Sequence, residues 1–99
     1  MMYIKIHEAY RLIVAICDSD ILGKKFEEGN MQLDVGERFY KGEELKKEEI
    51  ITLLKKYSKE DATFIIAGKE SINAAIDLGI IDKNAVKKIA GIPHALVLV

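Results

Sequence analysis

Hydrophobic and polar residues alternate at the start of the chain, and a continuous apolar run follows. In residues 2–7, two isoleucines share one face, while tyrosine, lysine and histidine share the other, which is typical of a half-buried strand. Residues 8–10 read as a short turn. Residues 12–17 are wholly apolar, which is typical of a strand covered on both faces. The pattern predicts a β-hairpin.

The next segment, residues 18–42, is rich in turn and capping residues around one further strand. Residues 18–20 are capping residues, and residues 21–23 predict a single helical turn that ends at a glycine. Gly29 and Asn30 mark a turn before residues 31–35, whose alternation predicts a one-sided strand. Residues 36–42 are interpreted as a loop.

The second half of the chain mixes helical and strand patterns. Apolar residues at three- and four-residue spacing, with acids early and lysines late, predict the clearest helix. Glycines and capping residues set the ends of the elements that follow. In order, we expect a helix over residues 44–58, a strand over 63–67, a helix around 72–79, a short helix around 82–91 and a strand over 95–99.

This order of elements predicts an α+β fold, because hairpins join the early strands and helices alternate with the later ones. We expect a two-layer sandwich with a mixed sheet of about five strands and two or three helices mainly on one face. The 99 residues suit a single domain, residues 1–99, with one core.

Composition narrows the function classes. Fifteen basic and sixteen acidic residues give a formal charge of −1, which disfavours a strongly basic nucleic-acid binder but leaves a local basic patch open. The single cysteine, Cys17, cannot form an intramolecular disulfide, so a disulfide-stapled secreted scaffold is excluded. The apolar runs are too short to span a bilayer. We therefore expect a cytoplasmic protein without a membrane partner.

Short motifs spread over the whole chain resemble those of a known family. They are K-x-H at 5–7, C-D-x-x-I-L-G at 17–23, R-F-Y-x-G at 38–42, G-K-E at 68–70, L-G-I-I-D at 78–82 and G-I-P-H-A at 91–95. In content and order, the chain resembles the archaeal proteins grouped as DUF424. An asparagine expected before G-K-E is absent, since residues 63–65 are Thr-Phe-Ile. The resemblance implies an archaeal, cytoplasmic α+β protein without an assigned activity, and it supplies no catalytic residues.

Catalytic and metal-binding candidates are weak. Cys17 and Asp18 follow one another at a strand end, and a thiolate nucleophile there would need His7 or His94 as its base. Free cysteine is usually a small buried hydrophobe, so the structural role is favoured. No close-spaced pair of metal ligands occurs, so we expect neither a metal site nor a cofactor. Residues 68–71 follow a strand like a phosphate loop, but they lack its first glycine, and an acid follows the lysine.

The leading hypothesis is a non-catalytic binding module for RNA or a translation-related assembly. Arg38, Tyr40 and Lys41 place cations beside aromatic rings, the combination that neutralises phosphates and stacks bases. His7 and His94 complete the expected binding residues, since antiparallel pairing of their strands would bring them within about 10 Å, close enough to share a ligand. Two alternatives stay open: a compact enzyme that uses Cys17 with a histidine, and a homodimeric interaction module.

Overall fold

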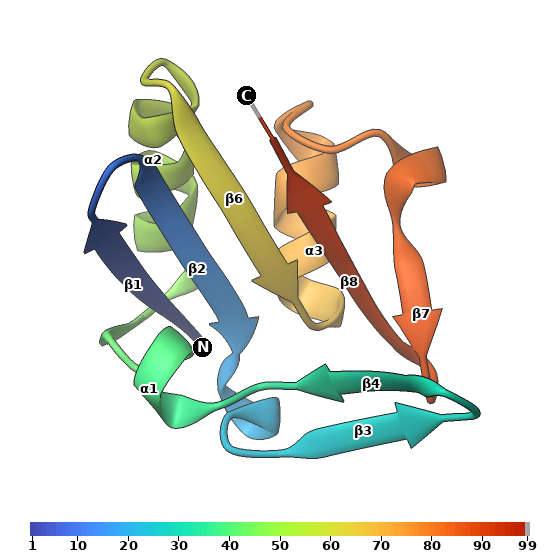
Figure 1. Ribbon diagram of the computed structural model, residues 1–99. Helices are drawn as coiled ribbons and strands as arrows, with labels where there is room; N and C mark the ends of the chain where they lie inside the picture. The colour runs from blue at the N-terminus through green and yellow to red at the C-terminus, as the bar shows by residue number, and fades with distance from the viewer. Residues whose placement is uncertain (99) are drawn as a thin grey trace.

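A mixed sheet forms the centre of the molecule, shown in the computed structural model of Figure 1, which describes residues 1–98. Within these residues the sheet has six strands, and only its central pair, β2 with β6, is parallel. Across the sheet the strands are β5 (Glu43–Leu45), β1 (Met2–Glu8), β2 (Leu12–Asp18), β6 (Ala62–Ala67), β8 (Ile92–Val97) and β7 (Lys87–Ile89).

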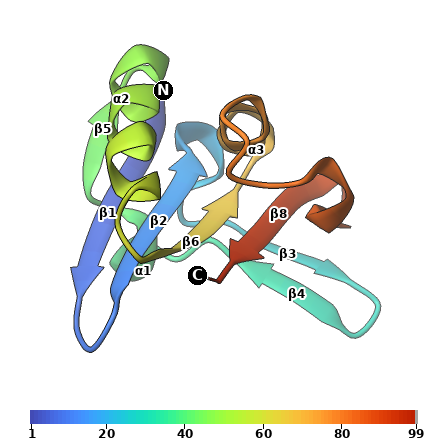
Figure 2. The ribbon, with the colours of Figure 1, turned by 90° about the horizontal axis from the view of Figure 1, so that it is seen from above.

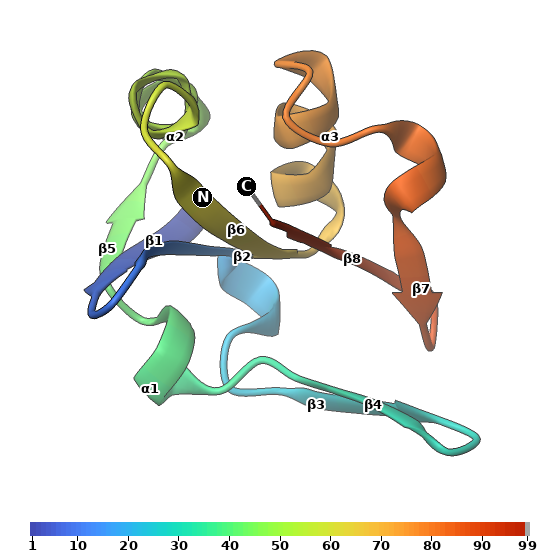
Figure 3. The same cartoon turned by 45° about the horizontal axis from the view of Figure 1, so that its top comes forward.

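Different elements cover the two faces of this sheet. Figures 2 and 3 show the two longer helices, α2 (Lys47–Ser58) and α3 (Lys69–Asp77), side by side on one face. The opposite face carries the 3₁₀ turn η1 (Ser19–Ile21), the short helix α1 (Glu37–Tyr40) and a separate hairpin of β3 (Lys25–Glu28) and β4 (Met31–Asp34). A second 3₁₀ turn, η2 (Lys83–Ala85), leads from α3 to β7.

Strand alternation divides the buried residues into two clusters. Val14 and Ile16 of β2 point toward the helices and pack with Ile50 and Leu54 of α2. Alternate residues of β2 join a second cluster under α1 and the β3–β4 hairpin; its fully buried members include Ala15, Cys17, Val35 and Ala67. Because β2 is buried on both faces, its residues 12–17 are continuously apolar, as expected.

The α+β class with a mixed sheet is confirmed, but the main sheet has six strands, two of which, β5 and β7, the sequence pattern does not predict. The strand predicted at 31–35 lies instead in the separate hairpin of β3 and β4. The predicted hairpin is present, with register from Met2↔Asp18 to Glu8↔Leu12. The strand expected at 95–99 runs from Ile92 to Val97, and residue 99 lies outside the described residues. The strand β3 was not expected, and the loop predicted over 36–42 contains α1.

The main helix begins later than its apolar pattern suggests. Residues 43–45 pair with β1, and the helix starts at Lys47, after the Lys46 backbone N–H donates to Glu49 Oε1 at 3.2 Å. Just before this pairing, Gly42 lies so close to the backbone of β1 that a Cβ there would overlap the carbonyl oxygen of Ile4. Tertiary pairing therefore overrides helical propensity in this segment.

The short helix predicted around 82–91 is wrong. Asp82 does act as a cap, accepting from the Asn84 N–H at 2.9 Å, but only the turn η2 follows before the chain becomes β7. Ala90 and Gly91 both have positive φ, 51° and 80°, which is the geometry of a two-residue hairpin turn between β7 and β8.

No helix among residues 1–98 is long and apolar enough to cross a membrane.

Candidate functional site

The carboxylate of Asp18 closes the amino end of α3. Its Oδ2 accepts from the Glu70 N–H at 3.0 Å, and its Oδ1 accepts from both the N–H and the hydroxyl of Ser71 at 2.8 Å. Gly68 makes this approach possible, because a Cβ there would overlap the carboxylate. The helix donors that would hold a phosphate are therefore occupied by a side chain of the protein itself. Asp18 has a structural role here.

Cys17 lies in the core beside Asp18. Burial, and secondarily the negative charge of Asp18, raise the pKa of the Cys17 thiol to about 12. Its side chain is fully buried, and its neighbours across the sheet are Tyr3 and Ala67. His94 lies one strand beyond Ala67, about 10 Å from Cys17 at the usual strand spacing. Cys17 therefore lacks the thiolate character that a nucleophile needs.

The aromatic-basic segment 38–41 is largely used to attach α1 to β1. Lys5 Nζ donates to the Arg38 carbonyl oxygen at 2.7 Å, and His7 Nε2 donates to the Phe39 carbonyl oxygen at 2.8 Å. The rings of His7 and Phe39 stack with centroids 4.6 Å apart. Tyr40 is 4% exposed, so its ring is not available to stack on a base. Arg38 and Lys41 keep exposed side chains.

The two histidines lie at opposite ends of the sheet, so the prediction that they share a ligand is wrong. His7 is level with Ile13 on β2, whereas His94 pairs with Ala67, which is level with Cys17. Two strands separate β1 from β8, which places the histidines about 20 Å apart at standard strand dimensions. The prediction failed because it assumed that β1 and β8 are neighbours.

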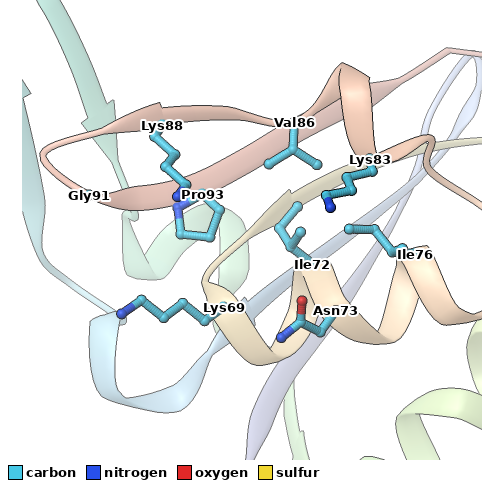
Figure 4. Close-up of a pocket in the computed structure, with 9 residues that line it drawn as sticks. All are labelled: Lys69, Ile72, Asn73, Ile76, Lys83, Val86, Lys88, Gly91 and Pro93. Atoms are coloured by element: carbon cyan, nitrogen blue, oxygen red, sulfur yellow. The ribbon is translucent and has the colours of Figure 1, made fainter.

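A cavity of about 380 Å³ lies between α3 and the segment from η2 to β8 (Figure 4). Three lysines surround it, each from a different element: Lys69 of α3, Lys83 of η2 and Lys88 of β7. We call these three residues the pocket lysines. The other lining residues are apolar or neutral: Ile72, Asn73, Ile76, Val86, Gly91 and Pro93. None of the nine is acidic, so the cavity combines an apolar floor with a cationic rim.

Helix and strand periodicity together build this cavity. Lys69, Ile72, Asn73 and Ile76 follow one another at helical spacing and share one face of α3. On the opposite wall, Lys88 pairs with Pro93 across β7 and β8, and alternation turns the flanking residues of β7 to the other face of the sheet. The Gly68 N–H donates to the Pro93 carbonyl oxygen at 2.9 Å and ties the two walls together.

The charge around the cavity differs from that of the whole chain. The chain as a whole has a formal charge of −1, yet the nine residues that line the cavity include three lysines and no acid. A concave site lined by one sign of charge concentrates the field and attracts oppositely charged ligands. The sequence analysis rejects the incomplete phosphate loop that contains Lys69, and it does not identify Lys83 or Lys88 as binding residues. The acid-free final segment, residues 83–99, was the available indication.

Two comparisons with known proteins found matches, one for the fold and one for the family. No curated protein matches the chain. A solved structure, described as that of an uncharacterized conserved protein from Methanopyrus kandleri, is similar with a TM-score of 0.82. It is 19% identical over 98% of this chain and 91% of that chain, a likeness that shows the fold alone. The model of the family described as "Protein of unknown function (DUF424)" matches residues 7–99, and the chain therefore belongs to the DUF424 family.

Proposed function

We propose that this protein is a non-catalytic RNA-binding module whose binding surface is the cavity rimmed by the pocket lysines. One observation carries the proposal: three lysines from three elements surround an acid-free cavity in a chain of nearly balanced charge. Lysines neutralise phosphates and release condensed counterions, which supplies the affinity. This surface replaces the segment at residues 38–41 as the main RNA contact.

The shape of the cavity favours single-stranded RNA. Bases in an A-form duplex are stacked, and their major-groove edges are out of reach of side chains, whereas a single strand can turn a base into a cavity. A volume of about 380 Å³ lies at the lower end of the range for ligand pockets. The cavity therefore suits one small group of the strand.

We propose a non-catalytic module because the two catalytic candidates, Cys17 and Asp18, have structural roles. Cys17 is a buried thiol with a raised pKa, and Asp18 is committed to the backbone of α3. Both side chains are buried, and neither lines the cavity. A buried free thiol also suits the reducing cytoplasm expected for this chain.

A binding titration tests the proposal. The affinity for a fluorescently labelled single-stranded RNA is measured at several salt concentrations by anisotropy, for the wild type and for a variant with all three pocket lysines changed to glutamine. Three phosphate contacts give a slope of log K against log salt of about −2. We expect the variant to lose affinity and most of this slope.

A matched variant controls for total charge. Lys24, Lys55 and Lys59 are exposed and lie outside the cavity, so changing them to glutamine removes the same charge elsewhere. The proposal predicts near wild-type binding for this control. Equal losses in both triple variants, or no RNA binding by the wild type, would overturn the proposal.

A further inference from the structure

We infer that the cavity receives one unstacked nucleotide of the RNA, with its base against the apolar floor, its flanking phosphates on the pocket lysines and its base edge against Asn73. The inference rests on the proposed function and specifies the unit that is recognised. It follows from the positions of three kinds of group around the cavity: the lysine amines, the apolar side chains and the amide of Asn73.

The pocket lysines stand at two ends of the cavity. Figure 4 shows Lys88 beside Pro93, Lys69 extending from the helix at the same end of the view, and Lys83 beside Ile76 at the other. Residues 69 and 76 of α3 are separated by about 10 Å along the helix axis. A strand that lies along α3 can therefore place the phosphates before and after one nucleotide on lysines at opposite ends.

The apolar floor lies between these cations. Ile72 and Ile76 project from α3, while Val86 and Pro93 form the facing wall (Figure 4). A base between two apolar walls is held by the packing that enzymes use when they take a base out of a stack. The cavity volume of about 380 Å³ favours one base over several.

Asn73 supplies a polar group at the edge of this floor. Its side chain is exposed, and its amide makes no hydrogen bond to another residue in the described part of the chain. An amide offers two donors and one acceptor in a plane and pairs well with the N6 and N7 positions of adenine. We therefore expect oligoadenylate to bind more tightly than oligouridylate, by about fivefold or more.

Two variants that keep all three lysines test the inference. Val86→Phe partly fills the cavity from its wall, and Asn73→Ala removes the amide from an exposed position. We expect Val86→Phe to weaken oligoadenylate binding by about fivefold or more while the salt slope stays at the wild-type value. Asn73→Ala should abolish the preference for adenine and leave the affinity for oligouridylate unchanged. Melting curves show whether each variant is folded. If Val86→Phe is unfolded, the result for Asn73→Ala alone tests the inference.

The outcomes separate the inference from the proposed function. If the wild type binds RNA through the pocket lysines but neither variant alters affinity or base preference, nucleotide insertion is wrong and the RNA-binding function stands. If the wild type binds no RNA, both are wrong. A competition experiment with adenosine 5′-monophosphate completes the test. If this nucleotide displaces the labelled RNA at concentrations similar to those of a competing oligonucleotide, the cavity takes a free nucleotide, and the assignment to RNA is overturned.

Discussion

Asp18 and Ser71, which are 53 positions apart in the sequence, are joined by two hydrogen bonds to one carboxylate oxygen. The backbone N–H and the hydroxyl of Ser71 both donate to Asp18 Oδ1 at 2.8 Å. Ser71 is fully buried, and Asp18 is only 7% exposed. These bonds fix the amino end of α3 at the carboxyl end of β2, and so they position Lys69 and the helix face that lines the cavity.

Asp18→Ala should therefore destabilise the fold. It leaves the N–H groups of Glu70 and Ser71 without their acceptor, and buried hydrogen bonds to a charged group are worth about 1.5–3 kcal/mol each. We expect the free energy of unfolding, measured by urea denaturation, to fall by about 2–4 kcal/mol. Asp20→Ala, at an exposed neighbour, is the control, and an equal loss in both variants would contradict the capping role.

Leu54→Ala tests the packing of α2 on the sheet. Leu54 is fully buried in the cluster that contains Val14 and Ile16, so its truncation leaves a cavity. The expected loss of unfolding free energy is about 2–5 kcal/mol. Lys55→Ala, one residue later on the exposed side, should change stability by no more than about 0.5 kcal/mol. A loss below about 1 kcal/mol for Leu54→Ala would place that residue outside the core.

The double variant Arg38→Ala, Lys41→Ala tests whether the α1 surface contributes to binding. The Arg38 contact with Lys5 uses a backbone carbonyl, which alanine retains, so the melting temperature should stay close to that of the wild type. If the cavity is the main RNA surface, RNA affinity should fall far less than in the variant of the pocket lysines. A comparable loss would return the main contact to α1, and unfolding would show that the pair is structural.

The sequence predicts those parts of the fold that depend on local pattern. The hairpin of β1 and β2 follows from alternation and a short turn, and the structure contains it. The segment from Asp82 to Gly91 has the pattern of a helix, because it begins with a capping residue and ends with a glycine. Its strand forms only because β8 pairs with residues 87–89, and that partner lies later in the chain.

The candidate site depends on contacts between distant residues, which explains why the sequence alone did not predict it. Lys69, Lys83 and Lys88 share no recognisable spacing, and they meet only after α3 packs beside β8. The two histidines show the opposite case. The sequence identifies both as functional candidates, but β2 and β6 lie between their strands and keep them apart. Residue types alone name candidates for a site, whereas strand order decides which residues meet.

His94 occupies an unfavourable position for a positive charge. Burial, and secondarily the nearby Lys87, lower the pKa of His94 below its ordinary value of 6.5. Its Nε2 is buried and has no hydrogen-bond partner among the described residues. The folded protein therefore favours the neutral ring, in which one nitrogen needs no proton.

Stability should consequently fall as the pH is lowered below about 6.5. The unfolded chain takes up a proton at His94 near that pH, while the folded chain resists it because its pKa is lower. The unfolded state thus binds more protons in this interval, and the free energy of unfolding decreases with acidification until the folded state also becomes protonated. Urea denaturation between about pH 5.5 and 7.5, above the range where carboxylates titrate, measures the effect. His94→Leu removes the group and should flatten this part of the profile. A profile equally steep in the wild type and the variant would show that His94 does not cause it.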